Sequence, residues 1–206
     1  MPKYFITVAG NIGVGKSTLV KLLAERTGWE PVYEAVAENP YLADFYEDMT
    51  RWSFHSQVFF LSRRLRQHHY LLQRQNAIIQ DRSVYEDAEI FARNLYQREL
   101  MPERDYHSYV SLYQAMTQSL KRPDLVVYLR ASTWTLISRI RKRGRDFERS
   151  VDSEYLAQLN IGYERWIKEI AGAWNLLIVD TDNFDMYEDL HWLEGILEEI
   201  RTRVGA

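Results

Sequence analysis

The chain has 206 residues, no cysteine and a formal net charge of −3. This length predicts one domain that buries roughly 70% of the surface of its unfolded chain, and the missing cysteines exclude a disulfide framework, a thiol nucleophile and a cysteine-based zinc site. A net negative charge argues against a nucleic-acid-binding protein, which normally carries a broad basic face. The chain has no run of about 18 apolar residues and no charged leader, so we expect a cytoplasmic protein without a membrane span.

Five short apolar runs predict buried β-strands, at residues 4–9, 31–33, 77–79, 125–129 and 176–179. Long segments with helical patterning separate them. This alternation is typical of an α/β fold, in which helices cover both faces of a parallel sheet and ligands bind at the carboxyl ends of the strands. The polar residues at those ends are therefore the first candidates for chemistry: Glu34, Asp81, Arg82 and Asp180.

The first predicted strand leads into the sequence Gly-Asn-Ile-Gly-Val-Gly-Lys-Ser at residues 10–17, which matches the phosphate-binding loop G-x-x-x-x-G-K-[ST]. An apolar stripe that begins at Leu19 predicts the required helix, which runs to about Arg26. The glycines let backbone N–H groups turn toward an anion, the lysine reaches the terminal phosphates, and the serine hydroxyl can ligate Mg²⁺. We therefore predict a nucleotide-phosphate site formed by Gly10, Asn11, Ile12, Gly13, Val14, Gly15, Lys16, Ser17 and Thr18.

Five residues at three places in the chain have both a functional and a structural interpretation. Glu34 follows the second strand and is either a catalytic carboxylate or a solvated loop residue. Gln57 and Arg64 are seven residues apart on one face of a predicted helix, and they either face one cleft or belong to a solvated surface. Asp81 and Arg82 follow the third strand, where an arginine can stabilise a transferring phosphoryl group or form a surface ion pair.

A cluster of five cations lies within residues 139–145. Gly144 can end the helix that carries Arg139 and Arg143, which leaves Arg145 in a loop. In an acidic protein such a cluster is a candidate lid over a polyphosphate. The five histidines show no metal-ligand spacing, so no metal site made by protein groups alone is indicated. An amphipathic helix is predicted at residues 186–203.

Taken together, these features resemble the deoxynucleoside kinases, and more narrowly the bacterial deoxyadenosine/deoxycytidine and deoxyguanosine kinases. The resemblance extends from Ile6 to about Ile200. Three family intervals match without a gap: Tyr46 to Gln57, Asp81 to Asp87 and Arg139 to Glu148. It implies a P-loop kinase fold in a single domain, residues 1–206, with a five-stranded parallel sheet flanked by helices and an arginine-rich lid at about 139–150.

The resemblance also implies catalytic roles. Glu34 matches the general base that takes the proton of the sugar 5′-hydroxyl while that oxygen attacks the γ-phosphorus of ATP. Arg82 matches the arginine that holds this base and the reacting phosphate, and Lys16 completes the catalytic set. Ser17 and Asp81 match the groups near Mg²⁺, although many animal members have a glutamate at the second position.

The remaining matches concern substrate binding. The implied deoxynucleoside contacts are Tyr46 and Glu148 at the 3′-hydroxyl, Gln57, Arg64 and Asp87 at the base, and Phe91 as an aromatic wall. The implied contacts with the donor phosphates are Arg139, Arg143 and Arg145. Some members have phenylalanine in place of Ser56, so the shape of the base pocket can differ.

The expected function is thus ATP- and Mg²⁺-dependent phosphorylation of a small-molecule deoxynucleoside in nucleotide salvage, with deoxyadenosine and deoxycytidine as acceptors. Deoxyguanosine is the alternative acceptor, and a nucleoside monophosphate kinase of the thymidylate kinase type is the rival enzyme. A guanine-nucleotide switch would carry N-K-x-D after a late strand, where residues 180–183 read Asp-Thr-Asp-Asn. The resemblance implies a homodimer, for which the aromatic-rich helices at 54–72 and 83–97 are candidate surfaces.

Overall fold

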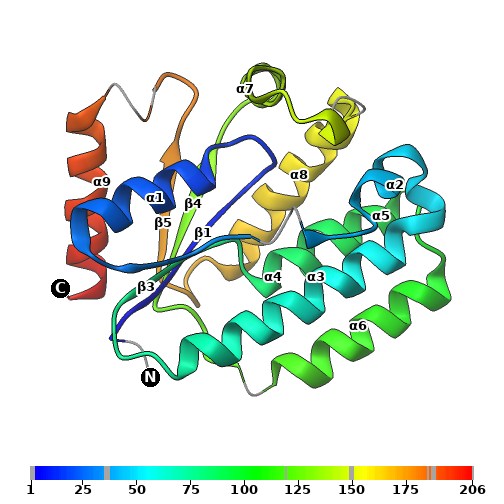
Figure 1. Cartoon of the computed structure of the whole chain (residues 1–206), viewed down its shortest axis with the longest axis horizontal. Coiled ribbons are helices and arrows are strands. Elements are labelled where there is room, and N and C mark those ends of the chain that lie inside the picture. Colours follow the sequence, from blue (N-terminus) through cyan, green and yellow to red (C-terminus); the bar gives the residue numbers. More distant parts are fainter. Residues whose placement is uncertain are drawn as a thin grey trace.

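The computed structural model of the chain describes residues 3–34, 38–118, 120–148, 151–184, 186 and 189–205. Within them, five strands form one parallel sheet in the order β2-β3-β1-β4-β5 (Figure 1). The strands are β1 (Phe5–Gly10), β2 (Glu30–Val32), β3 (Ile78–Asp81), β4 (Leu125–Arg130) and β5 (Leu176–Asp180). The predicted α/β fold is confirmed. Because β1 is central, the phosphate loop that follows it lies in the middle of the sheet's carboxyl edge.

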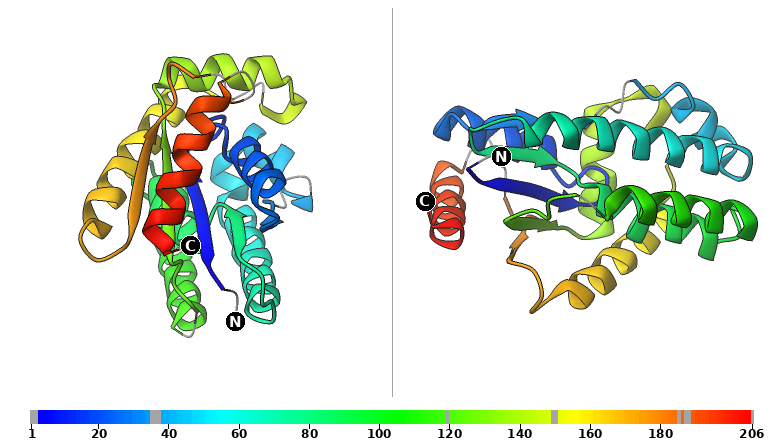
Figure 2. Two further views of the ribbon diagram at one scale, coloured as in Figure 1. Left: turned by 90° about the vertical axis from the view of Figure 1, so that its left-hand side faces the viewer. Right: turned by 90° about the horizontal axis from the view of Figure 1, so that it is seen from below.

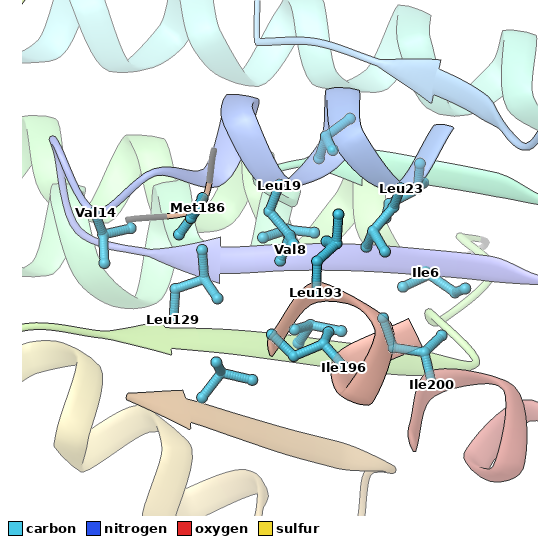
Figure 3. Close-up of a cluster of buried hydrophobic side chains, with 14 of the residues drawn as sticks. Ile6, Val8, Val14, Leu19, Leu23, Leu129, Met186, Leu193, Ile196 and Ile200 are labelled. Atoms are coloured by element: carbon cyan, nitrogen blue, oxygen red, sulfur yellow. The ribbon is translucent and has the colours of Figure 1, made fainter. Parts of the chain in front are cut away.

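Two helices, α1 (Lys16–Thr27) and α9 (Leu190–Val204), cover one face of the sheet. Figure 3 shows Val8 of β1 between Leu19 of α1 and Leu193 of α9. The predicted last helix begins at Leu190 rather than at residue 186, because the Asp189 side chain accepts a hydrogen bond from the backbone N–H of Trp192 at 3.0 Å and caps it there. Met186 is buried against the same core.

The other face is covered by α8 (Ser153–Ile170) and by a helical run made of α4 (Val84–Glu86), the π-helical segment η2 (Asp87–Ala92) and α5 (Arg93–Gln97). The right-hand view of Figure 2 shows α1 and α8 on opposite sides of β1. Aromatic side chains fill this second core, among them Tyr128 of β4 and Tyr163 and Trp166 of α8. Burial of both faces explains why the inner strands β1 and β4 are nearly continuous apolar runs.

A third group of helices consists of α2 (Leu42–Glu47), α3 (Met49–Leu72) and α6 (Glu103–Thr117) (Figure 1). The C-terminal end of α3 packs Leu71 against Phe5 and Ile78, where β1 and β3 begin. Leu61 and Leu65 of α3 pack on Tyr109 of α6. Leu112 and Met116 are exposed on α6. Helix α3 also buries Gln57 and Arg64, so these two side chains do not belong to a solvated surface.

The predicted lid is partly helical. Arg139 and Arg143 belong to α7 (Thr133–Arg143), which ends at Gly144 with a φ of +71°, and the short helix η3 (Asp146–Glu148) follows. Residues 149 and 150 of the predicted lid lie outside the described residues. Among the described helices, none combines the length and the apolar character that a membrane span requires.

Candidate active site

The phosphate loop connects β1 to the first turn of α1, as the motif requires. Gly15 is the N-cap of α1 and has a φ of +108°, a backbone conformation that strains any residue with a Cβ atom. Lys16 is buried and its Nζ donates to the carbonyl of Asn11 at 3.0 Å. Burial and the neighbouring Arg82 lower the pKa of Lys16 to about 8. A bound phosphate anion would favour the charged form again.

Two cavities meet at this loop. The first has a volume of about 190 Å³ and lies between the loop, α2, α3 and η2. The second has a volume of about 380 Å³ and lies between the loop, α7, Phe184 and Met186. Both are lined by the same five residues: Gly13, Lys16, Ser17, Arg143 and Arg145. A group passed from one cavity to the other would therefore cross a region lined by three cations.

Glu34 lines the first cavity at the point where β2 ends and is held by two buried arginines. Its Oε1 lies 2.6 Å from Nη2 of Arg64 and 3.4 Å from Nε of Arg82. Burial by itself raises the pKa of Glu34, but Arg82, Arg64 and Lys16 outweigh it and hold the pKa below its usual range. This carboxylate is therefore ionised at neutral pH. Because its pKa is low, it can take a proton only from a group that becomes acidic during a reaction.

Arg82 occupies a constrained position. Its φ is +64°, a left-handed conformation that costs a non-glycine residue energy and is found preferentially at functional sites. The guanidinium carbon lies 4.3 Å from the centre of the Phe91 ring, and Nη2 donates to the carbonyl of Gly10 at 3.3 Å. This geometry aims the side chain across the cavity, between Glu34 and the phosphate loop.

The wall opposite the loop carries the predicted base-reading groups. Asp87 and Phe91 both line the first cavity from η2, and the wider π-helical turn, which the sequence did not predict, is a frequent feature of functional sites. Gln57 lines the cavity from α3, and its Oε1 is buried without a hydrogen-bond partner among the described residues. Such a buried acceptor suits a donor group on a ligand.

Arg64 does not line either cavity; it lies behind the wall. Its Nε donates to Oδ2 of Asp87 at 3.0 Å and its Nη1 to the carbonyl of Asp81 at 3.0 Å, in addition to its bond with Glu34. Burial raises the pKa of Asp87 to about 6, because the nearby Arg64 offsets the loss of solvation only in part. Arg64 therefore orients both carboxylates rather than touching a base itself.

The end of the first cavity nearest the lid is formed by Tyr46 and Glu148. Glu148 is buried, and Arg143 donates to its carboxylate oxygens at 2.6 and 2.7 Å, with Arg145 at 3.5 Å. The sequence interpretation assigns these arginines to donor phosphates and Glu148 to a sugar hydroxyl. In this structure both arginines form ion pairs with Glu148, and both also line the second cavity.

Arg139 also lines the second cavity and is hydrogen-bonded to the protein. Its guanidinium donates to the carbonyls of Val14 at 3.1 Å and Phe184 at 3.2 Å, and to the hydroxyl of Thr181 at 3.0 Å. The side chain thus ties the phosphate loop to the segment that follows β5. Asp180, the other polar residue at a strand end, forms an exposed ion pair with Arg130, away from both cavities.

The residues present fit a magnesium ion. The Ser17 hydroxyl lies 2.5 Å from Oδ2 of Asp81, and Oδ1 of this buried carboxylate has no hydrogen-bond partner among the described residues. Mg²⁺ prefers one or two such oxygens together with water and substrate phosphates. The described residues contain no group of three or more carboxylate, imidazole or thiol side chains that could hold a metal alone, which is compatible with an ion bound together with a nucleotide.

Reasoning from the sequence missed some cavity-lining residues. Leu42, Phe60 and Tyr155 complete the first cavity, and Lys142 and Met186 the second. In a sequence, apolar and aromatic residues on amphipathic helices are normally assigned to the hydrophobic core. Only the folded structure shows that these particular residues line a cavity instead. Lys142 belongs to the cation cluster, which is the one signal that pointed to it.

Comparisons with known proteins agree with this geometry. A family model described as deoxynucleoside kinase matches residues 6–205. The deoxyadenosine/deoxycytidine kinase of Bacillus subtilis (strain 168) is 39% identical over 199 residues, which is 96% of this chain and 91% of that protein. The deoxyguanosine kinase of the same organism is 37% identical and covers 97% of both chains.

A similar solved structure is that of a deoxyadenosine kinase from M. mycoides with the products dCMP and a flexible dCDP bound. It is 33% identical, has a TM-score of 0.86, and covers 98% of this chain and 100% of that one. These matches cover more than nine tenths of each chain, and the region of this chain that matches the family model includes the phosphate loop, the cavity wall and the lid. The chain therefore belongs to the deoxynucleoside kinase family.

Proposed function

We propose that the protein transfers the γ-phosphoryl group of ATP to the 5′-hydroxyl of a deoxynucleoside, with deoxyadenosine and deoxycytidine as the preferred acceptors. The observation that carries this proposal is the position of Glu34, an ionised carboxylate in the first cavity beside Lys16 and Arg82, where the two cavities meet. A hydroxyl acceptor needs a base at that point. A phosphate acceptor does not, and Glu34 would repel it.

The chemistry follows from these contacts. The acceptor hydroxyl lies against Glu34, which takes its proton as the oxygen attacks the γ-phosphorus. Lys16, Arg82 and the lid arginines neutralise the charge on the moving group, which is the main catalytic requirement of phosphoryl transfer. Mg²⁺, held between Ser17, Asp81 and the phosphates, would supply further neutralisation. The deoxynucleoside 5′-monophosphate and ADP then leave from the two cavities.

The proposed base preference rests on acceptor groups. The buried Oε1 of Gln57 and the carboxylate of Asp87 both suit the exocyclic amino groups of adenine and cytosine. Thymine presents a carbonyl at the corresponding position and would be repelled. Guanine has an N1–H donor but also an O6 acceptor, so deoxyguanosine is the second candidate acceptor, in line with the deoxyguanosine kinases among the relatives.

ATP turnover separates the proposed function from its rivals. With ATP and Mg²⁺, ADP is expected to form when deoxyadenosine or deoxycytidine is added. It should not form when thymidine monophosphate is added or when no acceptor is present. Coupled-enzyme detection of ADP gives kcat/KM for all four deoxynucleosides and their monophosphates. Preferential use of a monophosphate would show a nucleoside monophosphate kinase, and acceptor-independent hydrolysis would show a switch or motor protein.

The discrimination against thymidine is expected to depend on pH. The Asp87 carboxyl, with a pKa of about 6, is charged above that pH and neutral below it, where it can donate a hydrogen bond to the thymine carbonyl. Between pH 7 and pH 5 the neutral fraction of Asp87 rises about tenfold and the charged fraction falls about tenfold. The ratio of kcat/KM for deoxycytidine to that for thymidine should therefore fall by up to about 100-fold. Taking a ratio cancels the titration of ATP and of Glu34. If the ratio depended on pH as steeply in Asp87→Asn as in the wild type, Asp87 would not be the group responsible.

We also propose that the enzyme works as a cytoplasmic homodimer. The location follows from the use of ATP as phosphoryl donor. The family resemblance supports the dimer, as do the exposed side chains of Tyr70 on α3 and of Leu112 and Met116 on α6, two helices that pack side by side. Large exposed apolar groups on adjacent helices favour burial against a second copy. Sedimentation equilibrium measures the mass in solution.

A further inference from the structure

A buried hydrogen-bond network joins the start of the phosphate loop to two helices that take no part in the chemistry above. Glu86 of α4 and Tyr163 of α8 are both fully buried. The Tyr163 hydroxyl lies 2.8 Å from the carbonyl oxygen of Gly10 and 2.9 Å from Oε1 of Glu86. The N–H of Gly10 donates to the same Glu86 oxygen at 3.2 Å. Both polar backbone groups of Gly10 are thus bonded to side chains.

The sheet topology explains why side chains are needed there. The last paired residues of β1 and β3 are Val8 and Asp81, after which β3 turns away at Arg82, and β1 continues to Gly10. The Glu86 carboxylate takes the place of a strand partner for the end of β1. On the other side, Gly10 approaches β4 so closely that a Cβ atom would lie 2.6 Å from the carbonyl oxygen of Leu129. The first residue of the loop is therefore fixed from both sides.

The same network reaches Arg82. The carbonyl oxygen of Gly10 accepts from Nη2 of Arg82 at 3.3 Å and lies 2.8 Å from the Tyr163 hydroxyl. The next residue, Ser83, donates both its backbone N–H, at 2.8 Å, and its hydroxyl, at 3.2 Å, to Oε2 of Glu86. One buried carboxylate thus sets the distance between the phosphate loop and the backbone that carries Arg82.

We infer that Glu86 and Tyr163 are positioning residues for phosphoryl transfer, acting through Gly10 and Arg82. The inference rests on the proposed function. Tyr163 has one hydroxyl hydrogen and two acceptors, the carbonyl of Gly10 and the carboxylate of Glu86. When Arg82 turns from that carbonyl toward the transferring phosphate, the hydroxyl donates to the carbonyl in its place. The carbonyl of Gly10 then keeps a hydrogen-bond donor in the transition state. Without Tyr163 this buried carbonyl would be left unpaired there, which would raise the activation barrier and slow the reaction.

Removing one hydroxyl tests this role, and the chain offers a matched control. The ring of Tyr128 stacks on that of Tyr163, with centroids 5.6 Å apart, but its hydroxyl donates to Glu164 and does not contact the loop. Tyr163→Phe is expected to lower kcat about 10- to 100-fold. The KM for deoxyadenosine should stay within about threefold, because the cavity wall is unchanged. Tyr128→Phe should leave kcat within about twofold.

A double-mutant cycle with Arg82→Lys tests the route of the effect. If Tyr163 acts through Arg82, the added Tyr163→Phe change should lower kcat less in the Arg82→Lys protein than in the wild type. Equal losses in both backgrounds would overturn this route. If Tyr163→Phe does not fold, the same double-mutant cycle can be measured with Glu86→Gln, a variant that keeps one acceptor oxygen.

Melting temperatures of all variants separate positioning from stability. A kcat of Tyr163→Phe equal to that of Tyr128→Phe would overturn the inference, and so would a loss confined to the KM for the deoxynucleoside. In either case the wild-type enzyme would remain an active kinase. Absence of deoxynucleoside phosphorylation by the wild type would instead contradict the proposed function itself.

Discussion

Replacing Glu34 with glutamine is expected to lower kcat by about 10²–10⁴-fold, the usual contribution of a general base. Glutamine keeps the shape of the side chain and an oxygen for Arg64 and Arg82, but it cannot take the proton of the attacking hydroxyl. The side chain lines the cavity beside Lys16 and Arg82, so we expect the loss in the chemical step. The KM for deoxynucleoside should change little, which steady-state kinetics with saturating ATP and Mg²⁺ would show.

Glu38→Gln is the matched control for this experiment. Glu38 is close in sequence, is exposed and forms its ion pair with Arg63 at 2.6 Å, outside both cavities. The same chemical change there should leave kcat nearly unaltered, since exposed ion pairs contribute little. A Glu34→Gln enzyme that keeps kcat within a few-fold of the wild type would exclude Glu34 as the base. A loss that appears only in the KM would assign it to substrate binding instead.

The second large effect concerns the base. The wild-type enzyme is expected to prefer deoxycytidine to thymidine by up to about 10⁴–10⁵ in kcat/KM, because a site built to accept a hydrogen bond rejects an analogue that presents another acceptor. Asp87→Ala should collapse this ratio, mainly through loss of deoxycytidine activity. The cause is removal of the acceptor on η2, together with a change at Arg64, whose Nε loses its partner. Competition assays with both nucleosides in one mixture measure the ratio directly.

Two further variants separate these causes. Asp87→Asn keeps an acceptor oxygen and adds a donor, so it should restore part of the deoxycytidine activity and admit thymidine. Gln57→Ala removes the other acceptor that lines the cavity and leaves the ion pair between Arg64 and Asp87 in place. Wild-type enzyme that phosphorylates thymidine as efficiently as deoxyadenosine would show that these residues do not read the base in this way. A preference for deoxyguanosine would favour the alternative acceptor.

The sequence alone determined the fold class and the phosphate loop, because both are encoded locally. Five apolar runs predicted the five strands of the described sheet, and the motif at residues 10–17 needs only a strand before it and a helix after it. The family resemblance added candidates that are scattered along the chain. Its prediction of kinase chemistry agrees with the family match over residues 6–205.

Only the tertiary structure decided how the scattered candidates meet. Sequence spacing allowed Arg64 to face a cleft, but the packing of α3 behind η2 makes it the partner of Glu34 and Asp87 instead. The π-helical turn at Asp87 and the bonds of Arg139 to backbone carbonyls also depend on contacts between distant segments. Local patterns indicate which side chains are apolar or charged, whereas burial, which sets the pKa of Glu34 and Asp87, arises only when α3, β3 and η2 pack together.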